Sequence, residues 1–245
     1  SIFYNCKSLA EINIPESVTS IGPSAFYGCT GIAEVVIPNN VTRIDDSAFG
    51  SCTGLTDVVL TNGNAVLGSY IFSNCTSLRN VTLPQGLRSV PYSMLYNCKS
   101  LTEIELPASI TSIGSSAFYG CSSLAKIELP ASVTSIGSSA FYDCSSLAGV
   151  DLPAGIRKIE EKTFYGCGSL VGIDIPESVT SIGQSAFEGC GSLTEIVIPD
   201  SVTTFGSFIF KDCTSLQSVI LPQGLKAVPY GMLYKAWPKS SSRPV

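Results

Sequence analysis

Apolar and polar positions alternate in a short pattern that recurs along the whole chain. In residues 101–123, two apolar positions alternate with Glu103 and Glu105, which predicts a half-buried strand over residues 103–106. Pro107 lacks an amide donor and is expected to end this strand. The apolar positions of this stretch are Leu101, Ile104, Leu106, Ile110, Ile113, Ala117, Phe118 and Cys121.

Small and hydroxyl residues shape the rest of the stretch. Ser109 and Thr111 suit a turn, in which their hydroxyls bond to nearby backbone groups. Gly114 is expected to adopt a backbone angle that other residues resist. Cys121 is expected to close the coil as a small buried hydrophobic residue.

The pattern repeats every 23 residues without an insertion. All ten cysteines follow this period, at positions 6, 29, 52, 75, 98, 121, 144, 167, 190 and 213. One unit cannot bury so much apolar surface alone, but stacked units place each apolar residue on its equivalent in the next coil. We therefore predict one continuous solenoid, with parallel strands stacked along a right-handed coil and short helical or 3-10 turns on the opposite side.

The register of the repeat predicts the organisation of the chain. We expect a partial repeat over residues 1–8, ten 23-residue repeats over residues 9–238 and a tail over residues 239–245. Residue 1 falls within a unit and is not methionine, so we expect the chain to be part of a longer protein. The residues after 236 fit either a natural cap with a tail or a segment appended to the repeats.

The motif L-x-x-I-x-I-P-x-S-V-T-S-I-G-x-x-A-F-x-x-C resembles the BspA-like, Treponema-type leucine-rich repeats. Residues 182–190 (I-G-Q-S-A-F-E-G-C) and 196–199 (I-V-I-P) carry this resemblance closely, and it extends from residue 1 to about 236. It implies a leucine-rich-repeat solenoid from a surface or secreted protein of a bacterium or a microbial eukaryote, associated with adhesion to host proteins, host cells or other microbes. The cell-surface or extracellular location rests on this resemblance, which brings no catalytic residues with it.

Composition argues against several classes of function. The chain has 19 acidic and 14 basic residues, and this net charge of −5 disfavours nucleic acid and anionic membranes, which bind basic faces. It contains no histidine, which removes the common catalytic pairings and histidine zinc sites, so we expect no enzymatic activity, no cofactor and no metal. No apolar run approaches the ~20 residues of a membrane span, so we expect no membrane insertion, and no signal peptide is visible.

The cysteines are expected to be free and buried. Equivalent thiols on stacked coils are parallel and lie about 4.8 Å apart. A disulfide instead needs β-carbons about 3.5–4.5 Å apart and side chains turned toward each other. The cysteine count therefore says little about the cellular compartment.

The outward side of the predicted strands, which we call the strand face, is the first candidate binding surface. It becomes apolar toward both ends of the chain, with valines at 36 and 59 and with Val197 and Ile220. One interpretation is a site for a basic protein partner, such as a host or extracellular matrix protein, or for a cation; the alternative is a solvated face that keeps the sheet soluble. The candidate residues on the middle coils are Glu103, Glu105, Lys126, Glu128, Asp151 and Asp174, with space left by Gly149 and Gly172.

A second candidate surface is a ladder of tyrosines that follow the repeated phenylalanine. Tyrosine is enriched in interfaces, and a glycan-binding module is one interpretation of the ladder. The alternative is packing between repeats, with the hydroxyls in water. A spacer that projects another domain, without a ligand of its own, is a third possibility for the chain, as is an intracellular scaffold, since free thiols suit a reducing compartment. The candidate tyrosines on four consecutive coils are Tyr96, Tyr119, Tyr142 and Tyr165.

Overall fold

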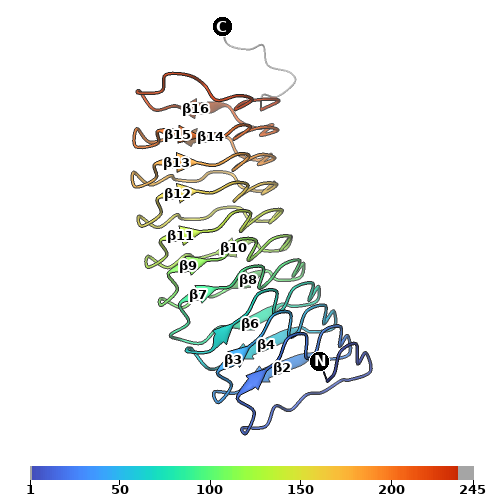
Figure 1. Ribbon diagram of the computed structural model, residues 1–245. Helices are drawn as coiled ribbons and strands as arrows, with labels where there is room; N and C mark the ends of the chain where they lie inside the picture. The colour runs from blue at the N-terminus through green and yellow to red at the C-terminus, as the bar shows by residue number, and fades with distance from the viewer. Residues whose placement is uncertain (1, 237–245) are drawn as a thin grey trace.

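The computed structural model describes residues 2–236 and is a solenoid of stacked coils (Figure 1). One line of parallel strands forms the strand face, and we call its members the face strands. They pair in a register of one repeat, so that Val36 lies opposite Val59 and Val197 opposite Ile220. The face strands are β2 (Glu34–Ile37), β4 (Asp57–Leu60), β6 (Asn80–Thr82), β8 (Glu103–Ile104), β10 (Lys126–Ile127), β14 (Glu195–Val197) and β16 (Ser218–Ile220).

A second line of parallel strands runs along an adjacent side, and the sequence analysis did not predict it. Its strands are two residues long and fall on the stretch that was expected to be only a turn with inward apolar residues. We call them the lateral strands. They are β1 (Ser20–Ile21), β3 (Arg43–Ile44), β5 (Val66–Leu67), β7 (Ser89–Val90), β9 (Ser112–Ile113), β11 (Ser135–Ile136), β12 (Lys158–Ile159), β13 (Ser181–Ile182) and β15 (Thr204–Phe205).

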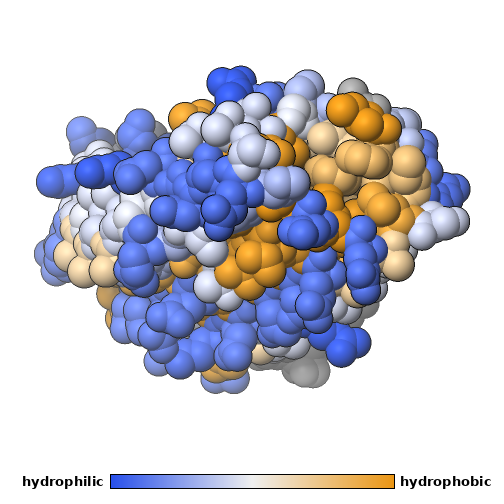
Figure 2. All heavy atoms as spheres, turned by 90° about the horizontal axis from the view of Figure 1, so that it is seen from below, coloured by the Kyte–Doolittle hydropathy of each residue, from blue (hydrophilic) through white to orange (hydrophobic). Residues whose placement is uncertain are grey.

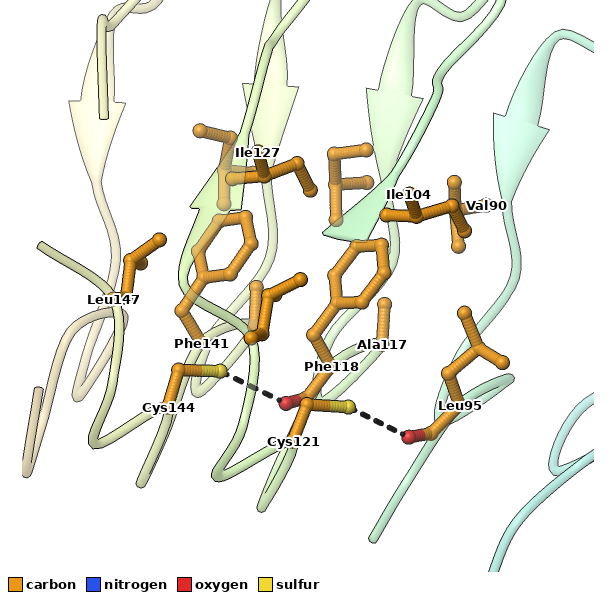
Figure 3. Close-up of a cluster of buried hydrophobic side chains, with 14 of the residues drawn as sticks. Val90, Leu95, Ile104, Ala117, Phe118, Cys121, Ile127, Phe141, Cys144 and Leu147 are labelled. Carbon is orange, nitrogen blue, oxygen red and sulfur yellow. Dashed lines mark hydrogen bonds between the residues drawn. The ribbon is translucent and has the colours of Figure 1, made fainter. Parts of the chain in front are cut away.

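The core is a set of identical side chains stacked from coil to coil. The rings of Phe118 and Phe141 are parallel, with centroids 5.4 Å apart, and Phe164 continues the column at 5.6 Å (Figure 3). Each of these rings is buried, and burying such a side chain contributes about 1.5–3 kcal/mol. The repeated apolar pattern therefore forms one continuous core, which confirms the predicted solenoid.

The cysteines are free, and all but the exposed Cys6 are buried. The Sγ of Cys144 donates a hydrogen bond to the carbonyl oxygen of Phe118 in the preceding coil at 3.1 Å (Figure 3). Equivalent bonds join Cys121 to Leu95 and seven further cysteines to the preceding coil. Free thiols were thus predicted correctly, but their role as hydrogen-bond donors between neighbouring coils was not.

The side opposite the face strands differs from the prediction of helical or 3-10 turns. Over residues 2–236 the chain has no helix, and this side consists of consecutive tight turns. Ala117 N bonds Gly114 O at 3.2 Å within its own coil, whereas Phe118 N bonds Ala140 O at 2.9 Å in the next coil. The alternation requires positive φ at two positions, Ser116 (φ 55°) and Gly120 (φ 69°), so the backbone cannot continue as a helix.

Gly114 has a different role from the one predicted, because its φ does not lie in the left-handed region. A β-carbon on Gly114 would come within 2.7 Å of the backbone of Pro91 in the preceding coil. At the equivalent position, a β-carbon on Gly137 would come within 2.4 Å of Ser115 N. Glycine is therefore needed here because two coils approach closely.

The lateral line of strands is interrupted where this glycine is replaced. Pro91 stands at the glycine position and has no N–H to donate, and within the described chain β5 does not pair with β7. Glu160 brings a β-carbon to the crowded position, and over the residues that the structure describes β11 likewise does not pair with β12. Asp45 also replaces the glycine, yet Asp45 N still donates to Ile21 O at 2.9 Å, and nothing in the structure explains this tolerance.

The first described coil exposes apolar side chains. Figure 2 shows this end of the solenoid, where hydrophobic atoms gather between hydrophilic rims. Ile2 is 88% exposed and lies with Phe3 beside an open concavity of about 540 Å³ that Ile14 and Phe26 also line. The residues that form the interior of later coils are therefore accessible here. The predicted tail over residues 239–245 lies outside the described residues.

Candidate binding surface on the strand face

The predicted acidic residues occupy one column of the strand face. Glu105, Glu128, Asp151 and Asp174 are exposed and lie at equivalent positions on four successive coils. In each coil the next residue toward the N-terminus points inward, as Ile104 and Ile127 do, since successive side chains of an extended chain alternate. The strand geometry thus holds these carboxylates in solvent along the solenoid axis.

Exposed apolar residues extend the same column at both ends. Val36 is 57% exposed, Val197 is 55% exposed and Ile220 is 56% exposed. The strand face therefore has an acidic centre between two apolar ends, as the sequence predicts.

The pairing of the face strands stops in the acidic centre. After β10, the next face strand in the described chain is β14, so two coils between them contribute none. Among the described residues, no backbone hydrogen bond joins Gly149–Asp151 or Gly172–Asp174 to a neighbouring coil. Only the positions just before them remain joined, with Ala148 N to Ala125 O at 3.4 Å and Val171 N to Ala148 O at 3.1 Å. The N–H and C=O groups of these two segments are therefore left for water or a ligand.

Two glycines make this unpaired region a hollow. A β-carbon on either Gly149 or Gly172 would meet no atom within 4 Å, so the space above them is open. The resulting open concavity has a volume of about 900 Å³, and we call it the glycine groove. Its polar lining side chains are Lys126, Glu128, Asp151 and Asp174.

The charges on the groove rim are partly paired. Lys126 Nζ lies 2.6 Å from Glu128 Oε1, and both side chains are highly exposed. The hydrogen bond and the positive charge of Lys126 lower the pKa of the Glu128 carboxyl, while Glu128 raises the pKa of Lys126. Asp151 and Asp174 have no ion-pair partner among the described residues, so the groove has a net negative charge.

The remaining predicted residues lie in an adjoining concavity of about 480 Å³. Glu103 and Glu105 line it together with Arg79, which the sequence analysis did not single out. Lys126 and Glu128 line both concavities, so all six predicted strand-face residues border one or the other of two adjoining hollows. Arg79 could have been found from the sequence, because it lies one residue before Asn80, which is the equivalent of Glu103 in its own coil.

A cation site finds no support on this surface. Over residues 2–236, no group of three or more histidine, cysteine, aspartate or glutamate side chains is close enough together to hold a metal ion. Acidic side chains that project in parallel from successive strands do not converge on one point, whereas calcium needs about six to eight oxygen ligands.

The tyrosine ladder stacks on itself. The ring centroids of Tyr119 and Tyr142 are 4.4 Å apart with an interplanar angle of 4°, and Tyr165 continues the stack at 4.4 Å. Tyr96 lies 4.6 Å from Tyr119, and its other side meets the edge of Tyr70 at 6.4 Å. The inner rings therefore present edges to solvent rather than faces, which supports packing between repeats and leaves glycan binding an unsupported prediction.

Stacking and partial burial also change the acidity of these phenols. Burial raises the pKa of the Tyr142 hydroxyl, and the neighbouring phenols of Tyr165 and Tyr119 raise it further. Burial likewise raises the pKa of Tyr119. The hydroxyls of Tyr119 and Tyr142 therefore favour the neutral, protonated form more strongly than a free phenol does.

Comparison with known sequences agrees with this architecture. The sequence profile described as the BspA type leucine rich repeat region, in 6 copies, matches residues 1–125 and 111–236. The chain belongs to this family of leucine-rich-repeat proteins. The resemblance inferred from the motif is thereby confirmed, whereas the predicted boundaries of the individual repeats remain a prediction.

Solved structures of leucine-rich-repeat proteins also resemble the chain. The chain is similar to a leucine-rich-repeat protein of T. pallidum, with 38% identity and a TM-score of 0.62, over 65% of this chain and 77% of that one. A leucine-rich-repeat protein of Bacteroides ovatus matches with 27% identity and a TM-score of 0.51, over 91% of this chain and 76% of that one. A protein of Eubacterium ventriosum, at 16% identity and a TM-score of 0.52 over 92% and 82%, shares the fold alone. No curated protein matches the chain significantly.

Membership of the BspA-type family sets the coarse function. Leucine-rich-repeat proteins of this kind generally bind proteins or are associated with surfaces, and they are typically non-enzymatic scaffolds. Within residues 2–236, no helix has the length and apolar character needed to cross a membrane.

Proposed function

We propose that this chain is a cell-surface or extracellular adhesion module that binds a protein partner through the strand face. The observation that carries the proposal is the acidic hollow between two exposed apolar ends. Complementary charge speeds encounter and fixes register, and apolar contacts supply much of the affinity. A host or extracellular matrix protein with a basic patch is the partner that this surface suits.

The experiment is a binding screen with the purified chain against extracellular matrix and serum proteins, at low and high salt. We expect a few partners whose association rate falls as salt rises, since screening acts on exposed charges over about 10 Å at 0.1 M salt. If no protein of the panel binds, the interpretation of the chain as a spacer is favoured.

Charge reversal locates the contact. The double variant Asp151→Lys with Asp174→Lys should weaken a partner found in the screen by at least about tenfold, because attraction becomes repulsion. The control is Glu16→Lys with Glu177→Lys, which makes the same change of net charge at exposed residues outside the strand face. Equal loss in both double variants would show that net charge, and not the strand face, governs binding.

A further inference from the structure

The glycine groove offers more than acidic side chains. It is a hollow of about 900 Å³ whose lining includes two stretches of backbone without partners in the neighbouring coils. Where face strands pair, as between β2 and β4 or between β14 and β16, the backbone N–H and C=O groups bond to the neighbouring coil. Pairing is also absent between β6 and β8, but there the exposed side chains of Asn80 and Glu103 project from the strands. A ligand in the glycine groove reaches unpaired carbonyl oxygens at positions that carry no side chain.

The glycines determine what can enter. At the equivalent position of the two preceding coils, Glu103 and Lys126 project from the face, whereas Gly149 and Gly172 project nothing. The vacated space is lined by the carboxylates and by the small, exposed, apolar side chains of Ala125 and Ala148. An elongated group from outside can lie here with its stem on an apolar surface and its head beside Asp151 and Asp174.

The acceptors determine the chemistry of that group. Carbonyl and carboxylate oxygens all accept hydrogen bonds, and Lys126, the cation that lines the groove, is already paired with Glu128 at 2.6 Å. The arginine guanidinium carries five N–H donors in a planar fork, no acceptor and a permanent positive charge. It can donate to a carboxylate and to backbone carbonyls at once, which a lysine ammonium does with less geometric fit.

We infer that the glycine groove is a receptor site for an arginine side chain that a loop of the protein partner inserts over Gly149 and Gly172. The inference rests on the proposed function and specifies its partner. The guanidinium bonds to Asp151, Asp174 and the unpaired carbonyls beside them, while the arginine stem lies against Ala125 and Ala148. The volume of the groove exceeds one side chain, so the flanking residues of the loop enter with it.

The test uses the full chain and a short glycine–serine peptide that carries arginine. A matched peptide carries citrulline, which has nearly the same shape as arginine but no charge. In a titration followed by the backbone amide NMR signals, we expect saturable shifts at residues 149–151 and 172–174 with the arginine peptide only. An equal response to citrulline, shifts spread over acidic residues outside the groove, or no saturation would overturn the inference.

A steric variant separates the groove from general acidity. Gly172→Gln fills the hollow without changing charge, and its β-carbon meets no atom within 4 Å, so the fold is retained. We expect the peptide to bind this variant at least about tenfold more weakly. Gly224→Gln is the control, since Gly224 is exposed and equally uncrowded but lies in the last described coil, outside the groove.

The two proposals can fail separately. If a partner from the protein screen is lost on charge reversal at Asp151 and Asp174 but binds Gly172→Gln normally, the strand face is the binding surface and the arginine site is wrong. If the arginine peptide occupies the groove and no protein in the screen binds, the site stands and the adhesion role fails.

Discussion

The thiol of Cys144 lies 3.1 Å from the carbonyl oxygen of Phe118 in the preceding coil and donates a hydrogen bond to it. The same bond recurs along the solenoid, so each buried cysteine joins the backbone of its own coil to that of the one before. The same carbonyl oxygen also accepts a hydrogen bond from Cys121 N within its own coil at 3.1 Å, so the thiol supplies a second, inter-coil bond to it. The cysteine is therefore a structural donor as well as a small apolar residue.

Removing this donor should destabilise the solenoid. Cys144→Ala removes the inter-coil hydrogen bond to the Phe118 carbonyl, which keeps its bond from Cys121 N, and opens a small cavity. We expect a loss of about 1–2 kcal/mol in the free energy of unfolding. Urea denaturation followed by circular dichroism measures it. Cys6→Ala is the control, because Cys6 is exposed, and it should change stability by less than about 0.5 kcal/mol. Equal effects of the two substitutions would show that the buried thiol bond contributes nothing.

The buried thiols should make the fold sensitive to alkaline pH. Burial raises the pKa of Cys52, Cys121 and Cys213 from an ordinary value of 9.0 to about 12. Folding therefore favours the neutral thiol, so this stabilisation is complete below pH 9 and is lost as pH rises from 9 toward 12. We expect the urea midpoint to be clearly lower at about pH 10 than at about pH 8. A midpoint that does not change over this interval would contradict the predicted burial of neutral thiols.

Burial should also protect the thiols from reagents. The thiolate is the reactive form, and in the folded chain only the exposed Cys6 is accessible among the ten cysteines. At about pH 8, iodoacetamide should label Cys6 alone, and addition of denaturant should allow all ten to react. Mass spectrometry of the labelled chain counts the adducts. Rapid labelling of any other cysteine would show that the coils open locally.

The close approach of neighbouring coils predicts a sharp difference between two glycines. Gly137→Ala places a β-carbon 2.4 Å from Ser115 N, so the coils must separate, and we expect a loss of more than about 1 kcal/mol. Gly22→Ala occupies the equivalent position in an earlier repeat but meets nothing within 4 Å. There we expect a change between neutral and a gain of about 1 kcal/mol, from lower entropy of the unfolded chain. Thermal denaturation of the pair decides whether crowding explains the glycine.

The tyrosine ladder should contribute to stability through its rings and not its hydroxyls. Tyr142→Ala removes a ring that stacks on Tyr119 and Tyr165 at 4.4 Å on either side, and we expect a loss of about 1–3 kcal/mol. Tyr142→Phe keeps both stacks and should be close to neutral. Unfolding in urea distinguishes the two variants. Strong binding of a glycan that both substitutions abolish would instead restore the carbohydrate interpretation.

The predicted features that proved correct are those that depend only on equivalence between repeats. A side chain recurring every 23 residues must lie on its copy in the next coil, so the columns of Phe118 and Cys121 follow from the spacing alone. The outward position of Glu105 and Asp174 follows equally from the alternation within an extended segment. The acidic centre and apolar ends of the strand face could therefore be read from the residues.

The features that were missed depend on the distance between neighbouring coils. Gly114 was assigned a special backbone angle, but its glycine is required because the backbone at Pro91 lies against it. The positive φ angles occur at Ser116 and Gly120, where the turns alternate between bonds within a coil and bonds to the next. A local pattern cannot show this alternation, since half of the partners are 22 residues away.

The sequence by itself determined the solenoid, its period, its stacked core and the charge pattern of its strand face, because each follows from which residues repeat. Tertiary structure decided the lateral strands, the tight turns and the interruption of backbone pairing over residues 149–151 and 172–174. These depend on how closely one coil lies against the next, which is set by packing across the stack. The glycine groove is a result of both, since the sequence leaves the space at Gly149 and Gly172 and only the spacing of the coils leaves their backbone unpaired.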